Sequence, residues 1–187
     1  MAVSTSFSVA TAHPLIDDLL DKHRTTIGEQ FVGYRNHCFT VYNIVRALMD
    51  LTPEDDAAVA IAVAFHDIAL WTDDRIDYID PSIALARDWC AASGHGEKAD
   101  RVADMIFWHH KIFRGALKTS DPLVLAFRNA DWSAFTFGFI PFDRNKDYRR
   151  AIASEFPDAG FHDFLNRRAL RHVLSGGIFN PLPMMKW

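Results

Sequence analysis

The chain has 187 residues, a formal net charge of −4 and 49% hydrophobic residues. This length favours one domain with a core of its own, and the mildly acidic balance disfavours a protein dedicated to binding duplex nucleic acid. The two cysteines, Cys38 and Cys90, exclude a disulfide framework and a zinc module built from several cysteines.

The N-terminal segment, residues 1–12, lacks a helical pattern and is expected to form a loose tail. It also lacks the charged start and long apolar run of a secretory signal. No apolar run in the chain approaches the roughly 18 residues that a membrane-spanning helix needs. We therefore expect a cytoplasmic protein that does not contact a membrane.

From residue 13 to residue 175, apolar residues recur at the spacing of helical faces, which predicts a single all-α domain of about eight helices. Thr52-Pro53, Asp80-Pro81 and Asp121-Pro122 are helix start signals, each a capping side chain followed by a proline. Strand signals are weak and are confined to the alternating stretch 135–139. The predicted helices cover residues 14–24, 34–50, 53–68, 80–92, 97–114, 122–132, 141–156 and 161–174.

The C-terminal segment, residues 176–187, has the sequence GGIFNPLPMMKW. Its glycines and prolines exclude a helix, and its apolar content predicts an extended arm laid over a protein surface. The sequence leaves open whether this arm covers its own chain or a second copy, so a homo-oligomer is one of the alternatives.

Nine histidines are present, and three of them lie on the apolar faces of three different predicted helices. His37, His66 and His109 each lie four residues from an apolar residue on the same face of their helix, as does Asp131. A single inward histidine is more often a packed core residue than a ligand. Burying the carboxylates of Asp67 and Asp131 is costly, however, unless each is paired or binds a cation. Two inward histidines beside two inward carboxylates therefore indicate a metal site.

The residues around these positions resemble the HD-domain superfamily of metal-dependent phosphohydrolases. Tyr34-Arg35-Asn36-His37 is similar to the first motif of that superfamily, and His66-Asp67 at the end of an apolar helix is similar to its doublet. Asn129-Ala130-Asp131-Trp132 resembles the late motif that supplies the last carboxylate. Gly160-Phe161-His162 and the proline-rich arm resemble an uncharacterised bacterial branch, and the resemblance extends over roughly residues 30–187.

The resemblance implies that His37, His66, Asp67 and Asp131 hold one divalent metal ion. Two imidazoles and two carboxylates suit Mn²⁺, Fe²⁺, Co²⁺, Ni²⁺ or Zn²⁺, whereas a strict Mg²⁺ site would favour oxygen ligands alone. Four protein ligands leave coordination positions open, so that a bound water can become the nucleophile that attacks a phosphoryl group. The predicted reaction is hydrolysis of a small phosphate ester, with nucleotides among the candidate substrates.

Further residues are assigned roles in this reaction. Asp67 and His109 are expected to take part in catalysis at the metal, and Asp73 is a candidate proton shuttle to the leaving oxygen. The substrate phosphate needs cationic partners, and a planar part of the substrate could stack on an indole. The predicted substrate-binding residues are Arg35, His110, Lys111, Arg114, Trp71 and His162.

Two other functions use the same fold. A ligand-binding or sensor protein would keep the metal without turnover. A di-iron oxygenase would need additional histidine ligands, and His95, the histidine between the doublet and His109, lies in a predicted turn between helices. The phosphohydrolase is the function that the residues favour.

Overall fold

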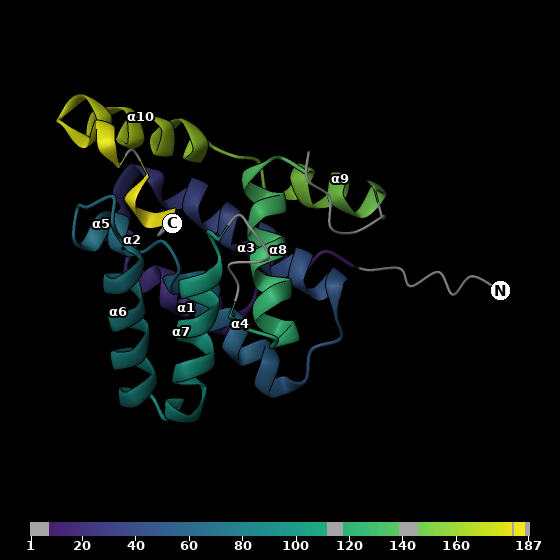
Figure 1. Ribbon diagram of the computed structural model, residues 1–187. Helices are drawn as coiled ribbons and strands as arrows, with labels where there is room; N and C mark the ends of the chain where they lie inside the picture. The colour runs from purple at the N-terminus through teal and green to yellow at the C-terminus, as the bar shows by residue number, and fades with distance from the viewer. Residues whose placement is uncertain (1–7, 112–117, 139–145, 181, 186–187) are drawn as a thin grey trace.

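The computed structural model describes residues 8–111, 118–138, 146–180 and 182–185. Every regular element within these residues is a helix, and no strand occurs among them (Figure 1). The prediction of an all-α fold is confirmed. No helix in the described part of the chain has both the length and the apolar character needed to cross a membrane.

Four helices form the centre of the molecule, and each packs against two of the others (Figure 1). Helix α3 contacts α4 and α8, and α7 contacts the same two helices from the other side. These central helices are α3 (Phe31–Leu48), α4 (Pro53–Phe65), α7 (Ala99–Trp108) and α8 (Pro122–Phe135). Because the four meet in the core, side chains from four distant parts of the sequence can converge there.

The remaining helices surround this centre. Helix α1 packs on α4, α6 packs on α4 and α7, and α9 and α10 both pack on α3. Their bounds are α1 (Pro14–Lys22), α2 (Arg24–Ile27), α5 (Ala69–Thr72), α6 (Ile79–Ala92), α9 (Lys146–Glu155) and α10 (Phe161–Leu174), with short 3₁₀ turns η1 (Gly28–Gln30), η2 (Gly96–Lys98), η4 (Gly177–Phe179) and η5 (Pro183–Met185).

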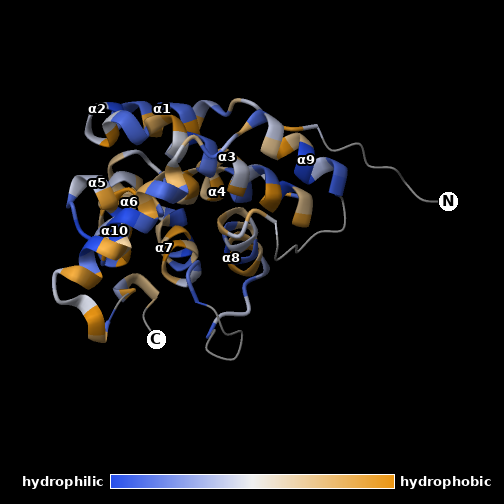
Figure 2. Ribbon diagram, turned by 90° about the horizontal axis from the view of Figure 1, so that it is seen from above, coloured by the Kyte–Doolittle hydropathy of each residue, from blue (hydrophilic) through white to orange (hydrophobic). Residues whose placement is uncertain are grey.

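The position of each helix follows from how its apolar residues are distributed. Helix α4 is buried on every side from Ala58 to Phe65, as expected for a segment without a polar face. Helix α1 lies at the edge and has hydrophilic residues outward, while Ile16, Leu19 and Leu20 are buried beneath it (Figure 2). Helix α4 is therefore the core element onto which the amphipathic helices pack.

The helix start signals are reproduced with one shift. The Thr52 hydroxyl accepts a hydrogen bond from the Asp55 amide at 3.1 Å, and the Asp121 carboxylate accepts one from the Leu123 amide at 2.9 Å. Helix α6, in contrast, starts at Ile79, so Pro81 lies within its first turn. A proline is tolerated there because the first amides of a helix have no intrahelical partner.

Several predicted boundaries are wrong in detail. The helix predicted over 14–24 is interrupted at His23, and the one predicted over 53–68 ends at Phe65. The helix predicted over 97–114 begins with η2 and ends at Trp108, so His109 and His110 lie in a turn. Residues 141–145 of the helix predicted over 141–156 are outside the described residues, and α9 follows them.

The two ends of the chain also differ from the prediction. Residues 8–12 are tied to α3, because the Asn43 side chain bonds both the amide and the carbonyl of Ala10, at 2.8 and 3.0 Å. The C-terminal segment contains the two 3₁₀ turns η4 and η5 and is not extended throughout. It does reach the protein body, where Met185 is buried, although Phe179 is fully exposed.

Gly33 allows the chain before α10 to approach α3 closely. A Cβ atom at this position would lie 3.1 Å from Phe161 Cβ and 3.2 Å from the Asp158 carbonyl oxygen. Both distances are shorter than ordinary van der Waals contact. Because Gly33 has no side chain, Phe161 and His162 can lie close to α3, the helix that carries His37.

Replacing Gly33 with alanine is expected to lower the free energy of unfolding by about 1–2 kcal/mol. The added methyl group must displace backbone atoms, and overpacking of this kind outweighs the gain in helix propensity. Thermal unfolding measures the change. Gly96→Ala is the control, because no heavy atom lies within 4 Å of a Cβ added there. Equal melting temperatures for wild type and Gly33→Ala would contradict the close approach.

Candidate metal centre

Three of the central helices bring two histidines and two aspartates together. His37 comes from the middle of α3, His66 and Asp67 follow α4 directly, and Asp131 comes from α8. The Nε2 atom of His37 lies 3.1 Å from Nε2 of His66 and 3.2 Å from Oδ1 of Asp131. The Nε2 atom of His66 lies 3.5 Å from Oδ2 of Asp67 and 3.8 Å from Oδ1 of Asp131. All four side chains are buried.

Backbone carbonyls fix which ring nitrogens face the centre. The Nδ1–H of His66 donates to the Val63 carbonyl at 2.8 Å, and the same carbonyl accepts from the Cys38 thiol at 2.9 Å. The Nδ1–H of His109 donates to the Ile106 carbonyl at 2.6 Å. In the neutral rings Nε2 therefore carries the free lone pair, which is the arrangement that metal-binding histidines need.

His109 adds a fifth ionisable group from the turn after α7. Its Nε2 lies 3.5 Å from Asp67 Oδ1, which is too far for a good hydrogen bond. Both atoms are buried, and neither has a hydrogen-bond partner among the described residues. Since an unpartnered buried polar atom is costly, the gap between Asp67 and His109 suits a bound cation, a water or a proton.

Tyr78 holds His110 on the far side of the same cluster. The Tyr78 hydroxyl and Nε2 of His110 are 2.5 Å apart. Asp67, His109 and His110 form a second group whose candidate ligand atoms lie within 4.8 Å of one another, and the first such group is His37, His66 and Asp67. Because Nε2 of His110 is already engaged by Tyr78, this second group is the poorer set of ligands.

Burial and neighbouring charges set the protonation states of the imidazoles. Burial lowers the pKa of His66 to about 4, and burial together with the neighbouring His109 lowers the pKa of His110 to about 3. Both rings are therefore neutral near pH 7. Burial also disfavours a charge on His109, but the carboxylates of Asp67 and Asp131 outweigh it and raise its pKa. Of the three rings His66, His109 and His110, His109 is thus the one that most readily takes up a proton.

The two carboxylates are ionised. Burial works against a charge on Asp131, yet the interaction with His37 and the proximity of His109 lower its pKa to about 2. For Asp67 the neighbouring His66 and His109 likewise outweigh burial, and its pKa lies well below the ordinary value. Two anionic carboxylates and neutral imidazole lone pairs at this spacing fit a divalent metal ion.

The comparison with protein families agrees with this geometry. The family model of the HD domain matches residues 34–150. The chain belongs to the HD-domain family. HD domains bind divalent metal ions, and the superfamily consists mostly of metal-dependent phosphohydrolases. No curated protein and no solved structure matches the chain.

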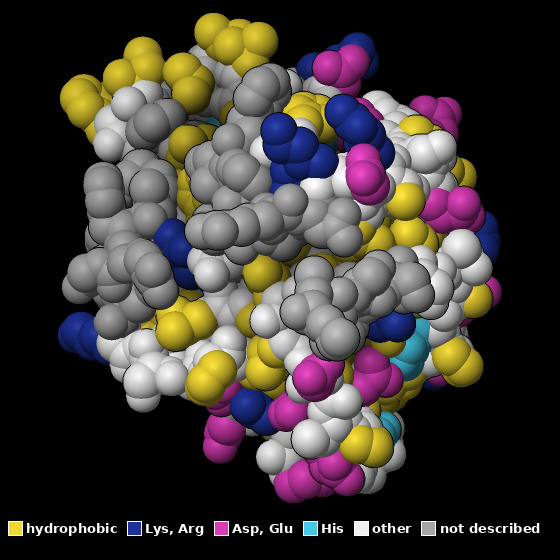
Figure 3. Space-filling view, turned by 90° about the vertical axis from the view of Figure 1, so that its right-hand side faces the viewer, with side chains coloured by type: hydrophobic (Ala, Val, Ile, Leu, Met, Phe, Trp, Pro, Cys, Tyr) yellow, Lys and Arg dark blue, Asp and Glu magenta, His cyan; other side chains and the backbone are white. Residues whose placement is uncertain are grey.

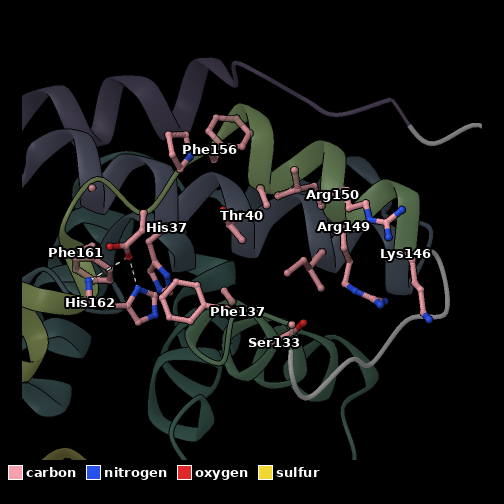
Figure 4. A pocket seen from close by; sticks show the side chains of 18 residues that line it. His37, Thr40, Ser133, Phe137, Lys146, Arg149, Arg150, Phe156, Phe161 and His162 are labelled. Atoms are coloured by element: carbon pink, nitrogen blue, oxygen red, sulfur yellow. Dashed lines mark hydrogen bonds and ion pairs between the residues drawn. The ribbon is translucent and has the colours of Figure 1, made fainter.

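Two cavities flank the centre of this HD domain, and His37 and Phe161 line both. The smaller, of about 210 Å³, also contains Asp67, Asp131 and His110 in its wall. Its other side is formed by apolar residues of α10 and the C-terminal arm, namely Leu165, Ala169, Leu182, Met184 and Met185. The larger, of about 470 Å³, extends between α3, α8 and α9 (Figure 4). The candidate metal centre is therefore buried but has open space beside it.

Two of the predicted substrate-binding residues line these cavities. His110 lines the smaller cavity. His162 lines the larger one, where Nε2 donates to the Phe135 carbonyl at 2.9 Å and Nδ1 bonds the Asp158 carboxylate. The structure thus places His110 beside the centre and His162 in the wall of the adjoining cavity, and their roles in substrate binding stay predictions.

Other predicted residues are not brought to the cavities. Arg35 pairs with Asp17 at 2.8 Å. Trp71 stacks on Phe164 with ring centroids 5.3 Å apart, in a layer behind Phe161. Asp73 is exposed beyond α5. None of the three lines either cavity, so their predicted roles in substrate binding and proton transfer have no geometric basis.

The residues after His110 give a mixed result. Lys111 does not line either cavity, and its carbonyl accepts a hydrogen bond from Nε of Arg128 at 2.5 Å. Arg114 lies outside the described residues.

His95, the extra histidine that a di-iron centre would need, stacks on Trp89 with ring centroids 5.3 Å apart and belongs to neither candidate metal group.

Two residues of the smaller cavity escaped sequence reasoning. Tyr78 is buried beneath it, and Arg168 lines it while pairing with Asp74 at 2.7 Å. Tyr78 precedes a helix start signal and Arg168 lies in the middle of α10, where the sequence pattern predicts an ordinary exposed charge. Neither position carries a motif that could have singled it out.

The Tyr34 hydroxyl bonds the backbone beside His66-Asp67. Tyr34→Phe is therefore expected to weaken metal binding about 10–100-fold. Its hydroxyl donates to the Ala64 carbonyl at 3.1 Å and accepts from the Asp67 amide at 3.3 Å, so its loss frees the backbone that orients Asp67. Calorimetric titration of metal-free protein with Mn²⁺ measures the affinity. Tyr42→Phe is the matched control, because it removes a hydroxyl that bonds Asp56 and not the doublet. Equal affinities for both variants would contradict a supporting role of Tyr34.

Proposed function

We propose that the protein is a metal-dependent phosphohydrolase that cleaves a small phosphate ester with a metal-activated water. The observation that carries this proposal is the cluster of His37, His66, Asp67 and Asp131, buried in the core and yet open to adjoining cavities. A purely structural metal site would be closed on all sides. The superfamily's chemistry supports the same reaction class.

The four side chains would hold one divalent ion, for which Mn²⁺, Fe²⁺, Co²⁺, Ni²⁺ and Zn²⁺ are the candidates. Such an ion lowers the pKa of a bound water and polarises a phosphoryl oxygen. Asp67 and Asp131 contribute the negative charge that keeps the ion in place, and His37 and His66 contribute neutral lone pairs. The His66 ring cannot turn away readily, because its Nδ1–H donates to the Val63 carbonyl.

His109 is the proposed general base. Its Nε2 faces Asp67 Oδ1 across 3.5 Å and has no hydrogen-bond partner among the described residues. The carboxylates of Asp67 and Asp131 raise its pKa, which favours acceptance of a proton at Nε2. The hydrogen bond from Nδ1 to the Ile106 carbonyl holds the ring in this orientation.

The smaller cavity is the proposed site of the phosphate that is cleaved. His110 and the Tyr78 hydroxyl lie at its polar end, beside Asp67 and Asp131, and Arg168 lies in its wall. Apolar side chains from α10 and the C-terminal arm cover the rest and limit the access of water. The partner that this site fits is a small phosphorylated molecule.

Metal analysis followed by an activity screen tests the proposal. Purified protein is stripped with a chelator, reloaded separately with each of the five candidate ions and offered an aryl phosphate and a set of nucleotides. We expect phosphate release that depends on the ion and is absent from the stripped protein. Metal bound at one ion per chain without release from any substrate would instead support the ligand-binding or sensor function.

A further inference from the structure

The larger cavity has an aromatic ring and a hydroxyl in the wall formed by α8 and the turn that follows it. His37 lines this cavity as well as the smaller one, so the larger cavity begins beside a candidate ligand of the metal. Figure 4 shows His37 and Thr40 on the α3 side of the cavity and Ser133 and Phe137 on the α8 side. Its volume of about 470 Å³ is typical of sites that enclose a small organic molecule.

Phe137 occupies a position at the end of α8 where glycine is the usual residue. The Phe137 amide donates to the Ala134 carbonyl at 3.1 Å, and the Gly138 amide donates to the Ser133 carbonyl at 2.8 Å. These two bonds close the helix as a Schellman motif, in which the residue at the Phe137 position is left-handed. Phe137 has φ +51°, where a side chain is strained. A phenylalanine here therefore costs stability that a glycine would not.

Burial does not account for this phenylalanine, since 65% of Phe137 is exposed. Its ring stacks on His162 with ring centroids 4.1 Å apart and 32° between the planes. His162 is itself fixed, because it bonds the Phe135 carbonyl and the Asp158 carboxylate. The Phe137 ring is thus held against an immobilised imidazole while it lines the cavity. Strained residues held in this way cluster at ligand sites, so the strain points to a ligand for the ring.

Ser133 adds a hydroxyl without a partner to the same wall. Only 1% of this residue is exposed, and its Oγ has no hydrogen-bond partner among the described residues. A hydroxyl within a helix can donate to the carbonyl four residues earlier, as Thr40 does to Asn36 across the cavity at 2.8 Å. Ser133 lacks such a bond, which costs free energy that a bond to a ligand recovers. Ser133 therefore indicates a polar atom of a ligand beside it.

The charges on the outer face near α9 favour a small ligand over a nucleic-acid strand. Single-stranded nucleic acid also stacks on aromatic side chains, but its binding needs a cationic groove as well. Among the described side chains of this face, basic ones occur in small groups beside acidic ones (Figure 3), and the whole chain has a net charge of −4. The planar group that suits Phe137 is therefore part of a small molecule.

We infer that the larger cavity binds a planar ring in the alcohol part of the substrate. The ring stacks on Phe137, and one of its polar atoms accepts a hydrogen bond from Oγ of Ser133. Phe137 follows Ser133 by four residues, which is about one helical turn, so that one ring can contact both. This ring site rests on the proposed function, which places the phosphate at the metal centre. It narrows the substrate class to phosphate esters whose alcohol part carries a heteroaromatic ring.

Matched phosphate esters test the stacking on Phe137. Each ω-phenylalkyl phosphate is compared with the ω-cyclohexylalkyl phosphate of the same chain length, because the two rings are similar in size and differ in planarity. With metal-loaded wild type, we expect kcat/KM at the best length to be about threefold or more higher for the phenyl compound. Equal values for both compounds at every length would overturn the inference.

Variants locate the stacked ring. The ratio of phenyl to cyclohexyl kcat/KM should fall close to one in Phe137→Leu. It should be unchanged in Phe179→Leu, the matched control, because Phe179 is fully exposed and lines neither cavity. A ratio that survives Phe137→Leu would overturn the inference.

Pyridine rings test the hydrogen bond from Ser133. Three pyridylalkyl phosphates, with the ring nitrogen in each possible position, are compared with the phenylalkyl phosphate of the same length. In wild type, kcat/KM for the best isomer should exceed that for the phenyl compound about threefold, and Ser133→Ala should remove the difference. Ser154→Ala is the control, because Ser154 is exposed on α9 and lines neither cavity. A preference for pyridine that Ser133→Ala leaves unchanged would contradict the assigned bond.

Melting temperatures separate a role in binding from a role in the fold. Without substrate, Phe137→Gly and Ser133→Ala should each melt at a higher temperature than wild type, because the first relieves backbone strain and the second removes an unpartnered hydroxyl. Each variant should nevertheless lose its own preference among the esters. Lower melting temperatures with unchanged preferences would show that the two side chains serve the fold alone and would overturn the inference.

Binding without turnover separates this ring site from the proposed function. If wild type releases no phosphate from any ester, the proposed function fails, and calorimetric titration of Mn²⁺-loaded protein with the same esters still decides the matter. We expect the phenyl compound to bind about threefold or more tightly than the cyclohexyl compound in wild type and equally in Phe137→Leu. Equal affinities in wild type, or binding of neither compound, would overturn the inference.

Discussion

Asp67→Ala is expected to abolish both metal binding and phosphate release. Asp67 is the residue common to the two groups of candidate ligands, and its Oδ1 is buried without a partner among the described residues. Its removal takes one of the two carboxylates from the centre and leaves His66 and His109 without the charge that they face. No neighbouring described carboxylate can replace it, because Asp131 already approaches His37 at 3.2 Å.

The melting temperature reports metal binding independently of activity. An ion that binds only the folded protein stabilises it by about 2.7 kcal/mol at a concentration of 100 times Kd, which corresponds to about 5–10 °C for a domain of this size. We expect this increase with Mn²⁺ in wild type and none in Asp67→Ala or Asp67→Asn. The isosteric Asp67→Asn variant separates loss of the ligand from loss of the fold.

Asp88→Ala serves as the control for Asp67→Ala. It also removes an aspartate, but from the exposed side of α6 and away from both cavities. Its melting temperature should rise on addition of Mn²⁺ as in wild type. Bound metal and undiminished activity in Asp67→Ala would show that the centre has been assigned to the wrong residues.

The sequence singled out these candidate ligands because an inward position on a helix constrains the chemistry there. Asp131 shares a face with buried residues of α8 such as Phe127, so its carboxylate had to meet a partner inside the core. Once several helices each carry one such group, the core is the only place where the groups can meet. The family resemblance then gave the pattern a function.

Proximity in sequence was a poor guide to which residues surround the candidate ligands. Arg35 is two residues from His37, which places it about 200° around the helix and therefore on another face, where it pairs with Asp17. Lys146 and Arg149 line the larger cavity although more than 100 positions separate them from His37. The packing of α9 against α3 brings them there, and hydrophobic periodicity does not encode which helices pack together.

His109→Gln is expected to lower kcat about 10²–10⁴-fold while metal affinity changes little. These magnitudes are those of a lost general base. His109 comes from the turn after α7, and its Nε2 faces Asp67. Among the described residues it forms no hydrogen bond or ion pair with His37 or Asp131. Glutamine retains a polar side chain but cannot take up a proton at neutral pH.

The decisive measurement compares kcat and metal affinity in the same preparations of wild type and His109→Gln. His95→Gln is the matched control, because His95 stacks on Trp89 and lies in neither candidate metal group. It should retain both activity and bound metal, whereas a di-iron centre that recruits His95 would lose metal in this variant. If His109→Gln loses the metal together with kcat, His109 is a ligand, and the proton must then be accepted by another group at the centre.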